Sequence, residues 1–334
     1  MNLYAFTSFC YIRTNNSIIM KAFYSTAYGG PEFSHYGDFP DPVMGDGQVL
    51  IEVKAVSINP VDYKVKKGVA KFLSRARFPR VFGSDFSGVV KAVGKDVKSF
   101  EPGDKVYGAS PVIWGKPGAL AQLLAADEKY VRAMTPQMSF EEAASLPIAA
   151  LTALNGLRRT GAGLGKEVMI NGGTGGVGHF AIQAARAKGA RVTATCSPAN
   201  ADLAKRLGAD ETMGYSPDDY KKCTRKFDAI LDTYGMMTTG DILRLLKHGG
   251  TYATTQIKIF LPVVSLVTQL LYDKKLTSSN LRGLPEDMAE METLFAEKRL
   301  IPLIENYFTL EKAGEAFEFT EHGKPRGKVI VRVA

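Results

Sequence analysis

The clearest chemical signal in this sequence is a run of six residues, Gly173-Thr174-Gly175-Gly176-Val177-Gly178. An apolar, strand-like stretch, 167–171, comes before it, and a helical stretch, 177–188, follows. In such a G-x-G-x-x-G motif the first glycine permits a tight turn, the second lets the backbone approach a pyrophosphate, and the third allows close helix–sheet packing. The helix N-terminus then faces the phosphates. We therefore predict that these six residues bind a dinucleotide; the alternative is a glycine-rich turn without a ligand.

The choice of cofactor depends on the end of the next predicted strand, 191–196. An NAD site usually carries an acid there for the ribose 2′-hydroxyl, but no Asp or Glu stands between Glu167 and Asp202. Ser197 and Asn200 could instead donate hydrogen bonds to a 2′-phosphate, so the sequence predicts NADPH. Because that loop has no Arg or Lys, Tyr215 or a basic residue brought in by folding would have to contribute.

Strands and helices alternate around this motif. Strands are predicted at 167–171, 191–196, 227–232 and 251–255, and helices at 177–188, 201–207 and 240–246. Alternation of this kind builds a parallel sheet covered by helices on both faces, so we predict a Rossmann domain over residues 135–283. Ligands gather at the carboxyl edge of such sheets, and Asp232 and Thr233 at the end of the third strand are therefore further predicted cofactor contacts.

The preceding part of the chain has short strand patterns separated by glycine- and proline-rich turns, which are typical of a small β-barrel. The closing strand, 327–333, shares this pattern. We therefore predict a discontinuous β domain over 20–134 and 284–334. Residues 1–19 carry one charge, Arg13, and are predicted to be a disordered extension; a mitochondrial transit peptide is the alternative.

The net charge of the 334-residue chain is +8, with 42 basic and 34 acidic residues. Eight basic residues and one acid lie between Lys54 and Arg80. A solvated basic face is the simplest interpretation, and nucleic acid or peripheral membrane contact is not favoured, because no aromatic–basic RNA-recognition motif is present. Three dispersed Cys fit a reducing compartment, so we predict a cytoplasmic location, with organellar or membrane-peripheral locations as alternatives.

One apolar stretch, 259–272, is too short to span a bilayer and contains Pro262. It is predicted to be a buried or interface helix, or a wall of a cleft for a lipophilic substrate.

Seven segments in order resemble the quinone oxidoreductase branch of the medium-chain dehydrogenase/reductase superfamily, and most of all its chloroplast-envelope quinone oxidoreductase homologues and alkenal or enone reductases. They are 57–64, 82–88, 102–106, 146–154, 173–178, 207–210 and 327–329. The resemblance implies an α/β fold with a GroES-like β-barrel domain and a Rossmann domain, in agreement with the strand and helix patterns. We also expect a homodimer.

The zinc alcohol dehydrogenases of this superfamily place a Cys, and then a Gly-His-Glu sequence, at their catalytic metal. This chain has Asn59 to Asp62 in the first region and Gly83-Ser84-Asp85 in the second. Three Cys are too few for a four-Cys zinc lobe, and the four His are dispersed. The sequence therefore predicts no metal site.

Without a Lewis acid, hydride transfer from NADPH to a quinone or an α,β-unsaturated carbonyl is the favoured reaction, since it needs only orientation, carbonyl polarisation and a proton. The resemblance implies that Asn59 hydrogen-bonds near the nicotinamide ribose or substrate and that Thr152 contacts the nicotinamide. Asp62 is expected to position this loop, and Lys64 to polarise the carbonyl or donate the proton. Each has an alternative: a turn at Asn59, a helix cap at Asp62, or basic surface at Lys64. The alternative function is an NADPH-binding protein with a structural or regulatory role.

Overall fold

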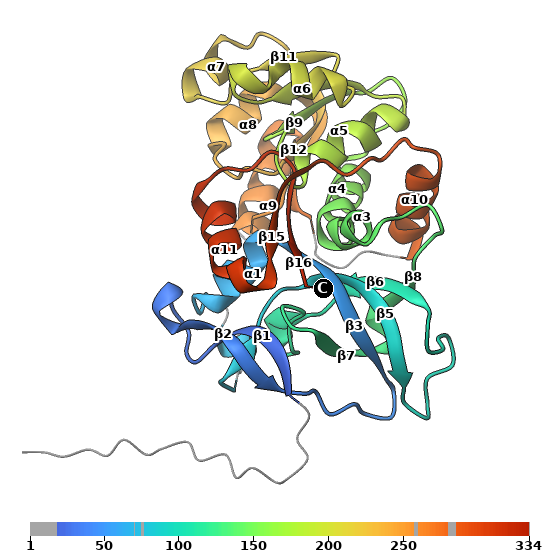
Figure 1. The fold of residues 1–334 in the computed structure, drawn as a ribbon. Coiled ribbons are helices and arrows are strands. Elements are labelled where there is room, and N and C mark those ends of the chain that lie inside the picture. The colour runs from blue at the N-terminus through green and yellow to red at the C-terminus, as the bar shows by residue number, and fades with distance from the viewer. Residues whose placement is uncertain (1–18, 70, 75–76, 257–259, 280–284, 334) are drawn as a thin grey trace, which may run out of the picture.

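The computed structural model describes residues 19–69, 71–74, 77–256, 260–279 and 285–333. The predicted extension, 1–19, lies outside this part of the chain except for Ile19, which begins the first strand. The described chain forms two halves, a Rossmann half around a parallel sheet and a β domain around a largely antiparallel sheet (Figure 1).

The Rossmann half is built on a six-stranded parallel sheet in the order β11-β10-β9-β12-β13-β14. Its strands are β9 (Glu167–Asn171), β10 (Arg191–Thr195), β11 (Glu211–Met213), β12 (Phe227–Asp232), β13 (Leu246–Thr254) and β14 (Lys275–Ser278). The predicted Rossmann domain is thereby confirmed, although the short strand β11 was not predicted. Val168 and Ile170 of the central strand point into one core and Met169 into the other, since successive side chains of a strand face opposite sides.

Helices cover both faces of this sheet. They are α4 (Pro147–Thr160), α5 (Gly178–Ala187), α6 (Ala201–Arg206), α7 (Pro217–Lys222), α8 (Thr239–Leu245), α9 (Leu261–Tyr272) and α10 (Pro285–Ala296). A full capping box at Ser139 and Glu142 begins α3 (Phe140–Ser145), which leads into this half: the Ser139 hydroxyl accepts from the Glu142 N–H at 3.2 Å, and the Glu142 carboxylate accepts from the Ser139 N–H at 2.9 Å.

The β domain is built on a seven-stranded sheet in the order β15-β16-β3-β5-β6-β8, with β7 paired to β3. The strands are β3 (Gln48–Ile58), β5 (Asp85–Val93), β6 (Lys105–Ala109), β7 (Leu123–Asp127), β8 (Val131–Ala133), β15 (Ile304–Thr309) and β16 (Lys328–Arg332). A smaller sheet contains β1 (Ile19–Ser25), β2 (Ser34–Pro40) and β4 (Arg80–Val81). The helices of this half are α1 (Pro60–Lys66), α2 (Lys71–Ser74) and α11 (Ala313–His322). Because β16 pairs with β3, the C-terminal segment returns to the N-terminal domain, as predicted.

The predicted domain boundary at residue 284 is not where the structure divides. Met291, Leu294 and Phe295 of α10 are buried in the same core as α4 and α5. The apolar face of α10 thus belongs to the Rossmann half, and the chain rejoins the β domain at β15, which begins at Ile304.

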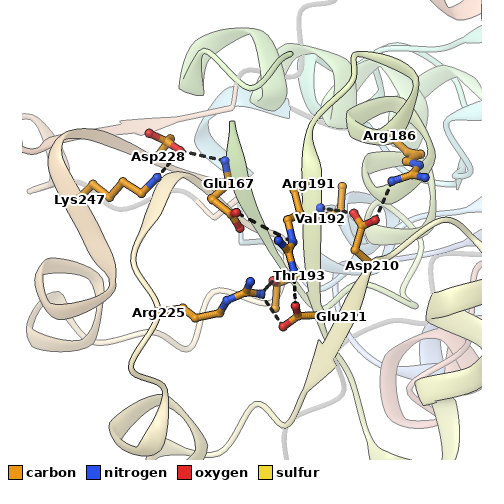
Figure 2. Close-up of polar contacts among 10 residues, drawn as sticks. All are labelled: Glu167, Arg186, Arg191, Val192, Thr193, Asp210, Glu211, Arg225, Asp228 and Lys247. Carbon is orange, nitrogen blue, oxygen red and sulfur yellow. Dashed lines mark hydrogen bonds and ion pairs between the residues drawn. The ribbon is translucent and has the colours of Figure 1, made fainter. Parts of the chain in front are cut away.

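Charged side chains gather at the amino ends of the parallel strands (Figure 2). Arg191 at the start of β10 pairs with Glu211 at the start of β11 at 2.8 Å. The Asp228 carboxylate on β12 accepts from the Glu167 N–H and from Lys247 Nζ, each at 2.8 Å. This network ties neighbouring strands together at the edge opposite the glycine-rich motif, so we assign it to the fold and not to a ligand.

Helix α9 is not the buried helix that was one alternative for this segment; the interface and cleft-wall alternatives stay predictions. Seven large apolar side chains between residues 260 and 272 are exposed, with Phe260 and Leu270 each at 75%. The sequence alone does not determine whether these side chains are buried, because burial depends on which other elements pack against the helix. Among the described residues, no helix is both long enough and apolar enough to cross a membrane.

Candidate nucleotide and reaction site

The glycine-rich loop joins β9 to α5 at the carboxyl edge of the parallel sheet. A Cβ at Gly178 would lie 2.0 Å from the Gly172 carbonyl oxygen, and one at Gly173 would lie 2.8 Å from the Cβ of Ala194. These two glycines are therefore required by packing within the protein. A Cβ at Gly175 would have only the Gly172 carbonyl oxygen within 4 Å, at 3.5 Å. Internal packing does not account for Gly175, whereas a closely approaching pyrophosphate would.

His179 supports this loop from inside α5. Its buried ring lies with Nδ1 3.0 Å from the Gly175 carbonyl oxygen, so Nδ1 carries the proton and donates. Burial lowers the pKa of His179 to about 3, which keeps the ring neutral beside the glycine-rich loop. From the sequence, the four His were weighed only as possible zinc ligands, so this role of His179 was missed. It depends on the position of His179 one residue inside the helix.

Asp232 lies at the predicted edge of the sheet, but both of its carboxylate oxygens accept hydrogen bonds from donors within the protein. Oδ1 accepts from Asn171 Nδ2 at 2.7 Å and from the Gly235 N–H at 2.6 Å, while Oδ2 accepts from the Tyr252 hydroxyl at 2.8 Å. The Thr233 hydroxyl likewise donates to the Asn171 carbonyl at 2.8 Å. Both side chains thus hold the loops that flank the glycine-rich segment. Asn171 and Tyr252 were not predicted, since nothing in their local pattern distinguishes them from ordinary strand residues.

One of the three residues predicted to select NADPH contacts the same loop. Asn200 Nδ2 lies 3.4 Å from the Thr174 hydroxyl oxygen. Ser197 precedes the short turn at 198–200, where its side chain makes no capping hydrogen bond. The Tyr215 ring packs against that of Tyr234, with centroids 5.5 Å apart.

A second polar cluster forms where three strand ends of the β domain meet. Asn59 follows β3, Asp85 begins β5, and Lys328 begins β16. Strand register brings them together, because Asp85 pairs with Ser57, and Val329 pairs with Ile58. All three side chains of the cluster are buried, at 3% exposure or less.

The contacts in this cluster are specific. Lys328 Nζ donates to Asn59 Oδ1 at 2.6 Å and lies 3.8 Å from Asp85 Oδ2. Asn59 Nδ2 donates to Asp85 Oδ2 at 2.9 Å and to the Ser57 carbonyl at 3.2 Å. The sequence placed Asp85 and Lys328 in family motifs without assigning them roles; only the fold shows that they share one buried site with Asn59.

Asp62 holds the cluster from the first turn of α1. Its Oδ2 accepts from the Asn59 N–H at 2.8 Å, and its Oδ1 accepts from the Ser84 hydroxyl at 2.5 Å. Asp62 therefore has the predicted helix-cap role, and the same hydrogen bond to the Asn59 N–H positions the loop between β3 and α1. Burial raises the pKa of Asp62 to about 6, and burial raises that of Asp85 to about 7 despite the opposing effects of Lys328 and Asn59.

The other two predicted reaction residues flank this cluster. Lys64 Nζ donates to Gln256 Oε1 at 3.2 Å, a contact between the β domain and the segment after β13. Thr152 is buried on α4. One turn before it on that helix, the Ile148 N–H donates to Asp85 Oδ1 at 3.2 Å, so Asp85 anchors the start of α4.

The basic segment does not form one solvated face. Lys66 is 6% exposed and donates to the carbonyls of Gly29 and Gly30, at 3.2 and 2.8 Å. Arg80 is also 6% exposed and donates to the carbonyl of Val112 at 2.6 Å. The prediction of a basic surface is wrong for these two residues, because their charged groups are used to tie loops together.

These features define a class of protein: an oxidoreductase with a Rossmann domain for a nicotinamide nucleotide and a GroES-like domain that contributes the second polar cluster. Two family models match the chain, "Alcohol dehydrogenase GroES-like domain" over residues 45–136 and "Zinc-binding dehydrogenase" over residues 207–331.

Relatives of known name cover nearly the whole chain. The chloroplastic quinone-oxidoreductase QR1 of Triphysaria versicolor is 32% identical over 94% of this chain and 98% of its own. The 2-methylene-furan-3-one reductase of Solanum lycopersicum is 32% identical over 93% and 79%, and the mitochondrial NAD(P)H oxidoreductase RTN4IP1 of Mus musculus is 33% identical over 95% and 90%. A solved structure, the quinone oxidoreductase from Coxiella burnetii, superimposes with a TM-score of 0.87 at 33% identity, covering 95% of this chain and 100% of that one. The chain belongs to the quinone oxidoreductase branch of the medium-chain dehydrogenase/reductase superfamily.

Proposed function

We propose that this protein is a zinc-independent, NADPH-dependent reductase that transfers hydride to a quinone or to the C=C bond of an α,β-unsaturated carbonyl. The observation that carries the proposal is that the buried polar cluster lies next to the glycine-rich loop. Lys328 donates to Asn59 within the cluster, and the adjacent Gly327 N–H donates to the Thr174 carbonyl of the loop at 2.9 Å. Relatives named for quinone and furanone reduction support the same reaction class.

The donor set does not fit a zinc ion. The regions where the zinc enzymes carry Cys and His hold Asn59 and Ser84 here, which are poor zinc ligands. The Asn59 amide oxygen already accepts from the Lys328 ammonium, which would repel a divalent cation. No step is therefore assigned to a metal.

The bound cofactor supplies the hydride, and the protein's own residues do the rest. The glycine-rich loop and the α5 N-terminus bind the pyrophosphate. Asn59 orients the nicotinamide end by accepting a hydrogen bond on its amide oxygen, since its NH₂ already donates to Asp85 and Ser57. Lys64 donates a hydrogen bond or proton to the developing negative charge on oxygen. Ser197, Asn200 and Tyr215 favour NADPH over NADH, since no carboxylate stands among them to repel a 2′-phosphate.

The test is an acceptor screen with both reduced cofactors. We expect NADPH to be oxidised faster than NADH when a quinone or enone is added, and Lys64→Met to lower kcat by about 100-fold, the smaller end of a general acid's usual contribution. Tight NADPH binding by calorimetry without turnover of any acceptor would instead identify a nucleotide-binding protein with a structural or regulatory role.

We also propose that the protein is a homodimer. Within the described chain, β14 pairs only with β13 and is an open edge of the sheet, and the adjacent α9 exposes its apolar face. A second copy related by a two-fold axis would cover both features. Sedimentation should show a dimer that Leu266→Glu/Leu270→Glu dissociates, while Val43→Glu, at an exposed site elsewhere, does not; a monomeric wild type would refute this proposal.

The cellular location is part of the proposal as well. We propose a cytoplasmic protein, from the cysteine usage, whereas relatives carry chloroplastic and mitochondrial names. Imaging of fluorescent fusions with and without residues 1–18 distinguishes these locations, because organellar signal that depends on the segment would replace the cytoplasmic assignment.

A further inference from the structure

Lys328 connects the nucleotide-binding loop with the second polar cluster. Its side chain is 2% exposed, although the residue lies in a C-terminal strand rich in basic residues. On one side, its neighbour Gly327 donates to the Thr174 carbonyl at 2.9 Å, and a Cβ at Gly176 would lie 3.8 Å from Lys328 Cδ. On the other side, its Nζ reaches Asn59 Oδ1 at 2.6 Å.

The Asn59 carboxamide has only one favourable orientation in this setting. Its oxygen accepts from the Lys328 ammonium, and its nitrogen donates to the Asp85 carboxylate and the Ser57 carbonyl. A flipped amide would place its NH₂ against the Lys328 ammonium and its oxygen against the Ser57 carbonyl oxygen. Because Lys has donors only and a carbonyl oxygen accepts only, both contacts would then be repulsive.

We propose that Lys328 is a positioning residue of the reaction centre, which holds the Asn59 carboxamide in one orientation and, through Gly327, ties that orientation to the nucleotide-binding loop. The proposal rests on the proposed function, since it is Asn59 that meets the cofactor or substrate. It assigns Lys328 no contact with either.

The rival role for Lys328 is purely structural. Three ionisable groups surround its ammonium: the carboxylates of Asp85 and Asp62, and the neutral ring of His179. Lys328 could serve only to neutralise the carboxylates. Lys328→Met alone does not separate the two roles, because it leaves the buried Asp85 without its counter-charge and the variant can fail to fold.

The discriminating pair is Asp85→Asn and Lys328→Met/Asp85→Asn. The first removes the carboxylate charge but keeps an amide oxygen that can accept from Asn59. The second removes the ammonium and the Asp85 carboxylate together, so Asp85 is not left as an unpaired charge, and Asp62 keeps its hydrogen bonds from the Asn59 N–H and the Ser84 hydroxyl. If Lys328 positions Asn59, kcat of the double variant falls by about 10- to 100-fold relative to Asp85→Asn, as expected for a misplaced reaction-centre group, while the NADPH Kd stays within threefold. Equal kcat values for the two variants would overturn the proposal.

A second readout does not depend on turnover. The fluorescence of bound NADPH reports the surroundings of the nicotinamide, and we expect it to differ between the same two variants. The triple variant that adds Asn59→Ala should show no further change, since Lys328 acts through Asn59. Identical emission from the two variants, or a further change in the triple variant, would overturn the proposal. If the wild type binds NADPH but reduces no acceptor, the proposed function fails and the fluorescence measurement alone decides the role of Lys328.

Discussion

Replacing Gly175 with Ala tests the nucleotide site without disturbing the fold. The added methyl would have only the Gly172 carbonyl oxygen within 4 Å, at 3.5 Å, which is an ordinary van der Waals contact. The φ angle of Gly175 is not in the left-handed region, so alanine can adopt the same backbone conformation. Internal packing therefore tolerates the substitution, and any strong effect must come from what approaches the loop from outside.

The expected magnitudes differ sharply for stability and binding. A glycine replaced by alanine in a compatible conformation stabilises a protein by about 0.4–1 kcal/mol, through the unfolded chain. A hydrogen bond to a charged phosphate contributes about 1.5–3 kcal/mol, and each 1.4 kcal/mol is tenfold in affinity. If the methyl displaces the pyrophosphate from even one backbone N–H, the NADPH Kd rises by about 10- to 150-fold.

Calorimetric titration with NADPH, together with thermal unfolding of the free protein, measures both effects. Gly163→Ala is the matched control, because a Cβ there meets nothing within 4 Å and the residue lies in the turn before β9, away from the loop. We expect the control to bind NADPH like the wild type. An unchanged Kd for Gly175→Ala in a normally folded protein would refute the assignment of this loop to the pyrophosphate.

Three further predictions follow from the same site. Gly178→Ala should lower the free energy of unfolding by about 1–3 kcal/mol, because its Cβ would lie 2.0 Å from the Gly172 carbonyl oxygen; an unchanged Tm would contradict this packing argument. Burial raises the pKa of Asp62 from its ordinary 3.8 to about 6, so the folded protein binds this proton more tightly than the unfolded chain does. Ionisation of Asp62 should therefore lower the free energy of unfolding by about 3 kcal/mol as the pH rises from about 4 to 6. Urea unfolding across that range should show a shallower fall for Asp62→Asn, and parallel pH profiles would count against the raised pKa. Asp232→Asn should lower the free energy of unfolding by about 1–3 kcal/mol, because the new amide NH₂ cannot accept from the Tyr252 hydroxyl; denaturation that matches the wild type would show that the network tolerates the change.

The strand–turn–helix geometry of the glycine-rich loop was predictable from sequence because it is local. The strand, the glycine-rich turn and the helix are consecutive, and the groups that would meet a pyrophosphate are backbone N–H groups placed by glycine. Alternation of apolar strands with helices likewise predicted the parallel sheet, since burial on both faces demands continuous apolar runs. Motifs in order along the chain were sufficient to indicate the family before any contact was known.

The buried cluster of Asn59, Asp85 and Lys328 was not predictable in the same way. Asn59 and Lys328 are 269 residues apart, and only the pairing of β16 with β3 brings them within a hydrogen bond. The sequence does not distinguish a buried lysine from an exposed one, so Lys66 was interpreted as surface charge and Lys328 received no role until the fold showed their carbonyl and amide partners. Helix α9 shows the converse, since its apolar run was compatible with a buried or an interface helix, and only the fold shows that most of its large apolar side chains are exposed. Sequence specifies which groups are available and their local backbone geometry, whereas burial, and with it the partners and pKa of each charge, depends on elements distant in the chain.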